Sequence, residues 1–286
     1  MGEGLEKILE QTTGASFFRA DLHIHSLGSS HDVRDAAMTP QNIVTTAIDE
    51  GLSMIAITDH NEINNVEAAV KAAQGTPLTV IPGVELSTPQ GHLLLYLPTL
   101  EALQKLHGKL SIVERGTQTS RCQESLFECL NLVKILGGFG ILAHVDIQSG
   151  FEVENPGAKP HKQDVLCHPA LLGIELKLGT SPISYADSDP DAKRAQMGRE
   201  RIKKLGLGNK QFLARVLSSD AHSLAALGRN AANDRKVTRF KMEKPSFEGL
   251  RIALEDADAR IRIEDQIPDA IPRVLGVMFE GGFLNG

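Results

Sequence analysis

The chain is poor in residues on which several functional classes depend. It has no tryptophan and only two tyrosines, so it lacks the aromatic side chains on which single-stranded nucleic acid usually stacks. Its three cysteines, Cys122, Cys129 and Cys167, are odd in number and have no paired spacing, which argues against a disulfide framework and favours a reducing compartment. The formal net charge of −6 does not support a free-standing nucleic-acid binder, although metal ligands could account for part of this acidity.

Long apolar runs and nucleotide-binding motifs are also missing. No segment approaches the ~20 apolar residues of a membrane-spanning helix, and the first residues lack the basic and apolar regions of a signal peptide. The sequence contains neither a GxxxxGK phosphate loop nor a GxGxxG fingerprint, so neither ATP nor NAD is an expected ligand. We therefore expect a cytoplasmic protein that does not contact membranes.

Apolar segments of strand length alternate with segments of helix length along the 286 residues. Strands are expected at residues 17–24, 54–58, 78–81, 92–97, 139–143, 172–178 and 213–217, and helices at 40–50, 66–74, 126–136, 191–205 and 247–253. Residues 100–121 are expected to form an insertion of uncertain structure, and residues 148–163 a polar loop over the mouth of the site. This alternation predicts an α/β fold with βαβ units and a parallel sheet or barrel, and the length suits one such domain.

Histidines and acids follow the expected strands. The motifs are Asp21-Leu22-His23-Ile24-His25 with His31 and Asp32 close behind, Thr58-Asp59-His60, Pro82-Gly83-Val84-Glu85, Gly91-His92, Ala143-His144 and Ser219-Asp220-Ala221-His222. Side chains at the ends of parallel strands converge on one mouth of an α/β barrel, so ligands far apart in sequence could meet there. Imidazole nitrogens and carboxylate oxygens are common donors to divalent metals in proteins.

Each motif alone also has an ordinary structural explanation. His23 and His25 share one face of a strand, where they could hold one ion or form an exposed pair on an edge strand. Asp21 shares that face and could orient one of the two histidines. Glu85 could bridge two metals or could be a turn residue. Taken together, these placements favour a metal site, because chance would have to produce all of them in one chain.

Residues 17–230 resemble the PHP (polymerase and histidinol phosphatase) superfamily of metal-dependent phosphoesterases, because these motifs follow one another in the order typical of that family. The resemblance implies a distorted seven-stranded (β/α) barrel with two or three divalent ions, Mn, Zn or Fe, at the C-terminal ends of the strands. It implies a first metal held by His23, His25, Glu85 and Asp220, a second that shares Glu85 and takes His92 and His144, and a third held by His31, His60 and His222. Asp32 is the alternative to His31, because many members carry an aspartate near this point.

The C-terminal part carries a second resemblance. Residues 235–242, 245–247, 273–276 and 279–283 are similar to the PHP module that precedes a P-loop ATPase domain in large bacterial proteins of the TrlF type. We therefore expect a single domain over residues 1–286. Its core would span about 17–230, and the extension 231–286 could connect to an ATPase domain in a longer form.

These resemblances imply hydrolysis of phosphoesters in nucleotides or nucleic acids. Glu85 and Asp220 would be the catalytic residues, and the attacking hydroxide would lie between two ions beside Glu85. The basic residues 235–241 and the ATPase-like tail favour a polymer substrate. Two alternatives stay open: a small-metabolite phosphatase of the histidinol-phosphate type, and a non-catalytic binding module. Other basic side chains are possible phosphate contacts but are more simply explained as solvated surface residues: Arg34, Lys162, Lys177 and Arg229.

Overall fold

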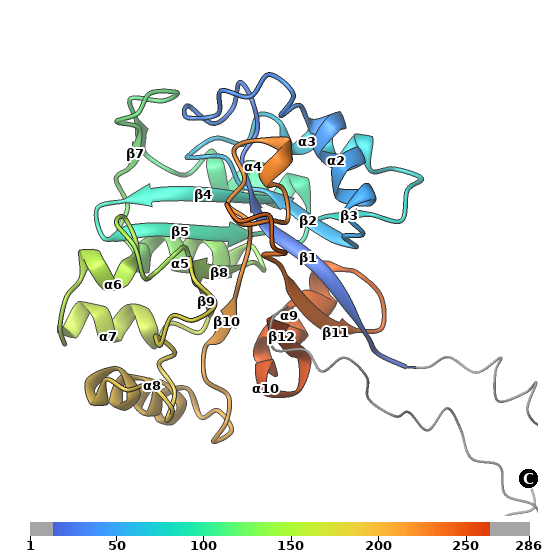
Figure 1. Ribbon diagram of the computed structural model, residues 1–286. Helices are drawn as coiled ribbons and strands as arrows, with labels where there is room; N and C mark the ends of the chain where they lie inside the picture. The colour runs from blue at the N-terminus through green and yellow to red at the C-terminus, as the bar shows by residue number, and fades with distance from the viewer. Residues whose placement is uncertain (1–13, 264–286) are drawn as a thin grey trace, which may run out of the picture.

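The computed structural model describes residues 14–263, whose strands form two five-stranded sheets and a small ribbon (Figure 1). The first sheet has the order β12 (Ile261–Ile263), β11 (Thr238–Met242), β1 (Ser16–Ile24), β2 (Met54–Ile57) and β3 (Thr79–Val80). The second has the order β10 (Ala214–Val216), β9 (Leu171–Glu175), β8 (Phe139–Leu142), β5 (Gly91–Tyr96) and β4 (Gly83–Thr88). The ribbon pairs β6 (Ile112–Val113) with β7 (Arg121–Cys122).

Helices accompany these sheets, and several of them begin at a capping residue that the sequence marks. They are α2 (Pro40–Asp49), α3 (Val66–Ala72), α4 (Leu100–His107), α5 (Leu126–Ile135), α6 (Phe151–Glu154), α7 (Pro160–Leu166), α8 (Ala192–Leu205), α9 (Phe247–Glu255) and α10 (Ala257–Arg260). The Thr39 side chain caps α2 with Pro40 in its first turn, and Ser246 caps α9, as expected. Ser125 and Glu128 form a capping box at the start of α5.

The two sheets share one apolar cluster. It contains Leu22 of β1, Tyr96 of β5 and Ile141 of β8, all buried, together with residues of β2, β9, β10 and β11. The Tyr96 hydroxyl donates a hydrogen bond to the Leu22 carbonyl, 2.8 Å away. Helix α9 packs against this cluster near the start of β8. There the ring of Phe247 stacks on that of Phe139, with 5.2 Å between the ring centroids. The opposite ends of the strands are thus left for polar side chains.

Two isolated bridges join the two sheets. Ile24, the last residue of β1, bridges Ala221 beyond the end of β10, and His60 beyond β2 bridges Glu85 in β4. The first bridge joins the end of β1 to the segment after β10, and the second joins the segment after β2 to β4. The mixed α/β fold expected from the sequence is therefore present.

Strand direction and the connecting segments differ from the expectation in several places. β5 runs antiparallel to both β4 and β8, because a hairpin reverses the chain between β4 and β5, and β11 runs antiparallel to β1 as the chain returns to the first sheet. Glu85 lies within β4, which the sequence analysis did not identify as a strand. Residues 100–121 form α4 and the β6–β7 ribbon. Residues 148–163 contain α6 and the start of α7 rather than a loop.

Two further expectations concern the ends of the chain and membranes. The extension that begins at 231 adds β11 to the first sheet, whereas residues 273–283 of the TrlF-like pattern lie outside the described part of the chain. Among residues 14–263, no helix combines the length and apolar character that a membrane crossing requires.

Candidate metal centre

Glu85 lies at the centre of the histidines that the motifs singled out. It is fully buried in β4. Its Oε1 lies 2.9 Å from His92 Nδ1 and 3.1 Å from His144 Nε2. Its Oε2 lies 3.0 Å from His60 Nδ1 and 3.1 Å from His23 Nε2. Each carboxylate oxygen therefore faces its own group of imidazole nitrogens.

The antiparallel direction of β5 explains how His92 reaches Glu85. Ser87 pairs with His92 across the β4–β5 hairpin, so the start of β5 lies beside the end of β4. The Ala143 N–H then donates to the His92 carbonyl at 3.1 Å, which places His144 next to His92. A histidine at the beginning of one strand thus meets a histidine after the end of another.

β1 and the segment after β10 supply a second group. The Nε2 atoms of His23 and His25 lie 3.0 Å apart, and Asp220 Oδ1 lies 3.6 Å and 3.2 Å from them. The His25 N–H donates to the Ala221 carbonyl at 3.0 Å, which holds the two segments together. Asp220 has a φ of 55°, a left-handed backbone that a non-glycine residue adopts only when its surroundings hold it there.

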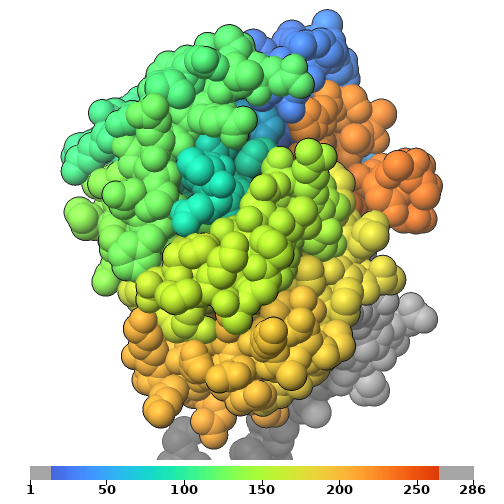
Figure 2. All heavy atoms as spheres, turned by 90° about the vertical axis from the view of Figure 1, so that its left-hand side faces the viewer, coloured from blue at the N-terminus to red at the C-terminus, as the bar shows by residue number. Residues whose placement is uncertain are grey.

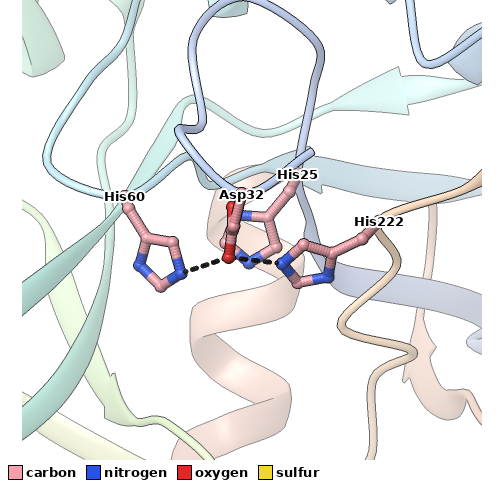
Figure 3. Close-up of side chains that lie close together, drawn as sticks. All are labelled: His25, Asp32, His60 and His222. Atoms are coloured by element: carbon pink, nitrogen blue, oxygen red, sulfur yellow. Dashed lines mark hydrogen bonds and ion pairs between the residues drawn. The ribbon is translucent and has the colours of Figure 1, made fainter. Parts of the chain in front are cut away.

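A third group lies where His25, Asp32, His60 and His222 approach one another (Figure 3). Asp32 Oδ2 lies 2.9 Å from His222 Nε2 and 3.3 Å from His60 Nε2. His31 belongs to none of the possible metal groups among the described residues, although its ring centroid lies 5.3 Å from that of His60. The structure therefore brings Asp32, the alternative to His31, into this group.

The electrostatics of the site follow from acids and histidines buried together. Burial raises the pKa of Glu85, but His60, His23 and other histidines outweigh this effect and hold the pKa well below its usual value. Burial lowers the pKa of His23, but Glu175, Glu85 and Asp220 outweigh it and raise the pKa well above the usual value. The histidines thus keep the acids ionised, which is the state in which carboxylates bind metals.

The residues fit divalent metal ions. The three sets whose possible ligand atoms lie within 4.8 Å of one another are His25, Asp32, His60 and His222; His23, His25 and Asp220; and His60, Glu85 and His92. His144 Nδ1 is buried and has no hydrogen-bond partner among residues 14–263. A cation is the simplest partner for so many converging lone pairs, and nitrogen with carboxylate oxygen is a donor set that Zn, Mn and Fe accept.

Two charged groups lie at or just beyond the end of β9, and only Lys177 was named from the sequence, whereas Glu175 was not. Glu175 Oε2 accepts a hydrogen bond from His23 Nδ1 at 2.9 Å. Lys177 Nζ donates to Asp220 Oδ2 at 2.8 Å, so this lysine is not merely a solvated surface residue. Glu175 ends a fully buried apolar strand, which is the same signal that singled out the other motifs. Applied to β9, that signal could have found it.

Asp21 and Asp59 support loops rather than histidines. Asp21 accepts hydrogen bonds from the Ser219 N–H at 3.0 Å and from the Ser219 hydroxyl, which corrects the expectation that it orients a histidine side chain. Asp59 accepts from the N–H and hydroxyl of Ser26, both at 2.6 Å, and burial raises the pKa of Asp59 to about 6. Each buried aspartate thus holds the loop that follows a neighbouring strand.

Several basic residues are engaged within the protein. Lys162 is buried against Glu152 in the α6–α7 segment. The other two candidates pair elsewhere, since Arg229 lies 2.7 Å from a Glu50 oxygen and Arg34 donates to the His31 carbonyl. Within the basic stretch 235–241, Arg235 donates to the Glu50 carbonyl and Lys236 is buried. These contacts weaken the sequence argument for a basic polymer-binding surface there.

Comparison with known proteins points to one family. Residues 21–159 match the PHP domain family. An error-prone DNA polymerase of Cutibacterium acnes is 40% identical over 68 residues, which are 24% of this chain and 6% of that protein. A 5'-3' exoribonuclease of Haemophilus influenzae is 35% identical over 68 residues, 24% of this chain and 23% of that protein.

A solved structure shows the same fold. The lesion-specific endonuclease PfuEndoQ from Pyrococcus furiosus superposes with a TM-score of 0.61 at 21% sequence identity, covering 86% of this chain and 57% of that one. This chain therefore spans only part of each of these relatives. The matched residues 21–159 include Glu85 and the histidines that surround it. The sequence match places residues 21–159 of this chain in the PHP domain family, and the solved structure shares the fold.

Proposed function

We propose that this protein is a metal-dependent phosphoesterase whose site, centred on Glu85, holds two or three divalent ions of Mn, Zn or Fe. The observation that carries the proposal is the convergence of imidazole nitrogens on both oxygens of one buried carboxylate. The first ion would take His23, His25, Glu85 and Asp220, the second Glu85, His92 and His144, and the third His60 and His222 with Asp32 in preference to His31.

We further infer that the two sheets form the wall of a distorted seven-stranded barrel. Its strands would be β1, β2, β4, β5, β8, β9 and β10. The isolated bridges at Ile24–Ala221 and His60–Glu85 and the apolar cluster shared by both sheets support this arrangement. A barrel would explain why the proposed ligands gather at one mouth.

The chemistry of a phosphoester fits this site. Divalent ions would lower the pKa of water and offset the charge of the phosphoryl oxygens. Glu85 and Asp220 would orient the attacking water through their carboxylates. Lys177 is partly exposed, with its Nζ 2.8 Å from Asp220 Oδ2, and would offer a cation to a phosphoryl oxygen of the substrate.

The proposed substrates are phosphoesters of nucleotides or nucleic acids. Two similar proteins are named as an exoribonuclease and a lesion-specific endonuclease, and this supports the choice. A small-metabolite phosphatase of the histidinol-phosphate type uses the same chemistry and is the second candidate. The acids and histidines gathered around Glu85 favour an enzyme over a non-catalytic binding module.

A substrate screen tests the proposal. The protein, loaded separately with Mn, Zn or Fe, is offered a generic phosphomonoester and phosphodiester, histidinol phosphate, a 3′,5′-bisphosphonucleotide, and labelled single- and double-stranded DNA and RNA. We expect nucleotide or oligonucleotide cleavage to exceed cleavage of histidinol phosphate. Much faster cleavage of histidinol phosphate would select the metabolite phosphatase instead, and no hydrolysis by any metal form would reject the phosphoesterase.

A further inference from the structure

One buried acid outside the proposed ligand set touches two of its histidines. Glu175 is the last residue of β9, and its residue exposure is 1%. A buried carboxylate is costly unless hydrogen bonds compensate for the lost water. Here Oε2 accepts from His23 Nδ1 at 2.9 Å and from the backbone N–H of His144 at 3.1 Å. Glu175 therefore joins β1 to the segment that follows β8.

The contact with His23 determines which ring nitrogen carries hydrogen. An ionised carboxylate can only accept hydrogen bonds, so Nδ1 of His23 must donate. In a neutral ring, Nε2 then keeps its lone pair. This Nε2 points at the shared site, 3.1 Å from Glu85 Oε2 and 3.0 Å from His25 Nε2. Glu175 thus selects the tautomer of His23 that can bind a metal through Nε2.

The contact with His144 holds an unusual backbone. The φ of His144 is 26°, in the left-handed range that non-glycine residues rarely adopt. The Glu175 carboxylate accepts the His144 N–H, and the Glu175 carbonyl accepts the Val145 N–H at 2.9 Å. Gly150 packs so closely that a Cβ there would lie 2.2 Å from the His144 carbonyl oxygen. This packing directs His144 Nε2 to Glu85 Oε1, 3.1 Å away.

We propose that Glu175 is a positioning residue that orients His23 and His144 toward opposite oxygens of Glu85. It touches neither the proposed ions nor the substrate and acts through the two histidines. The inference rests on the proposed metal site, but it does not depend on which phosphoester is cleaved. Carboxylates that hold metal-binding histidines in this way typically contribute 10- to 100-fold to metal affinity.

The test measures metal binding rather than activity. Zinc affinity is measured by competition with a chromophoric chelator for the wild type, Glu175→Ala, Glu175→Gln and Asp189→Ala. Asp189 is a matched control, because it is also a buried acid but pairs with Arg194. Nitrogen-15 NMR of the zinc-loaded wild type reports which ring nitrogen of His23 keeps its proton. Circular dichroism establishes that each variant is folded.

We expect Glu175→Ala to weaken zinc binding by roughly 10- to 100-fold. Glu175→Gln should recover most of the affinity, because its amide oxygen can accept both hydrogen bonds, and Asp189→Ala should bind zinc like the wild type. NMR should show the proton of His23 on Nδ1. Unchanged affinity in Glu175→Ala, an equal loss in Asp189→Ala, no recovery in Glu175→Gln, or a proton on Nε2 would each overturn the inference. Absence of hydrolysis by a wild type that binds zinc would reject only the proposed function.

Discussion

At the scale of single residues, the centre depends on a carboxylate that two groups of histidines share. Glu85 offers two carboxylate oxygens, one for each of two ions, whereas a single imidazole cannot bridge two ions in this way. Its backbone in β4 is held on both sides, because β5 pairs with it on one side and the segment around His60 bridges it on the other. The hypothesis that Glu85 bridges two ions came from the sequence. A substitution that removes the charge of this side chain and keeps its shape tests it.

Glu85→Gln should reduce the metal content by more than one ion per chain and lower kcat by at least about 100-fold, since the shared anionic donor is lost. Elemental analysis and steady-state hydrolysis of the best substrate measure these effects. His31→Ala serves as the comparison and should change metal content less. Normal metal content and activity in Glu85→Gln would contradict the bridging role.

His168 gives a residue-scale prediction away from the metal site. Its Nε2 lies 3.0 Å from Asn131 Oδ1, and its Nδ1 accepts the Ala170 N–H. Burial, together with Lys134 and Arg201, lowers the pKa of His168 to about 4. The folded protein thus keeps this ring neutral at pH values where the unfolded chain has already bound a proton.

The direction of the pH effect on stability follows from the difference in proton binding by His168 between the folded and unfolded states. The contribution of His168 to stability is present above pH 6.5 and is lost as the pH falls from 6.5 toward 4, by up to about 3 kcal/mol. Urea unfolding of the wild type and His168→Gln at pH 7.5 and pH 5 isolates this contribution from other histidines. The wild type should lose more stability on acidification than the variant. Equal losses would mean that His168 does not bind protons differently in the two states.

At the scale of elements, the α6–α7 segment is joined to its surroundings by buried charges. Figure 2 shows this segment in yellow-green across one face of the molecule, with α8 below it. Lys162 of α7 pairs with Glu152 of α6 and donates to the Asn155 carbonyl at 3.0 Å. Glu152 also accepts from the Tyr185 hydroxyl at 2.6 Å. Polar residues in this stretch suggested a loop, but they form the internal contacts of two helices.

Lys162→Met should lower the free energy of unfolding by about 3–5 kcal/mol, because Glu152 would lose its buried cation. Chemical denaturation followed by circular dichroism measures the loss. The double variant Lys162→Met with Glu152→Gln should be more stable than the single variant, since no unpaired charge remains. If the single variant unfolds like the wild type, the pair does not support this segment.

At the scale of the whole molecule, metal binding and folding should be linked. The proposed ligands come from both sheets, so bound ions would favour the folded chain and hold its sheets together. A ligand at 100 times its dissociation constant stabilises a fold by about 2.7 kcal/mol. Stripping the metal with a chelator should therefore lower Tm, and adding back Mn or Zn should restore it, while Mg should restore less. Scanning calorimetry measures this, and an unchanged Tm after complete metal removal would contradict the linkage.

The sequence by itself determined the α/β class, most helices and strands, and the side chains that gather around Glu85. Local signals suffice for these, because apolar periodicity and capping residues act over a few positions, as at Thr39 and Ser246. The tertiary structure decided what depends on contacts between distant segments. It made β5 antiparallel and thereby brought His92 beside Glu85, it placed Asp32 rather than His31 among the histidines, and it put Glu175 behind His23. No local pattern contains this information, because the direction of a strand and the partner of a buried charge are set by packing across the whole chain.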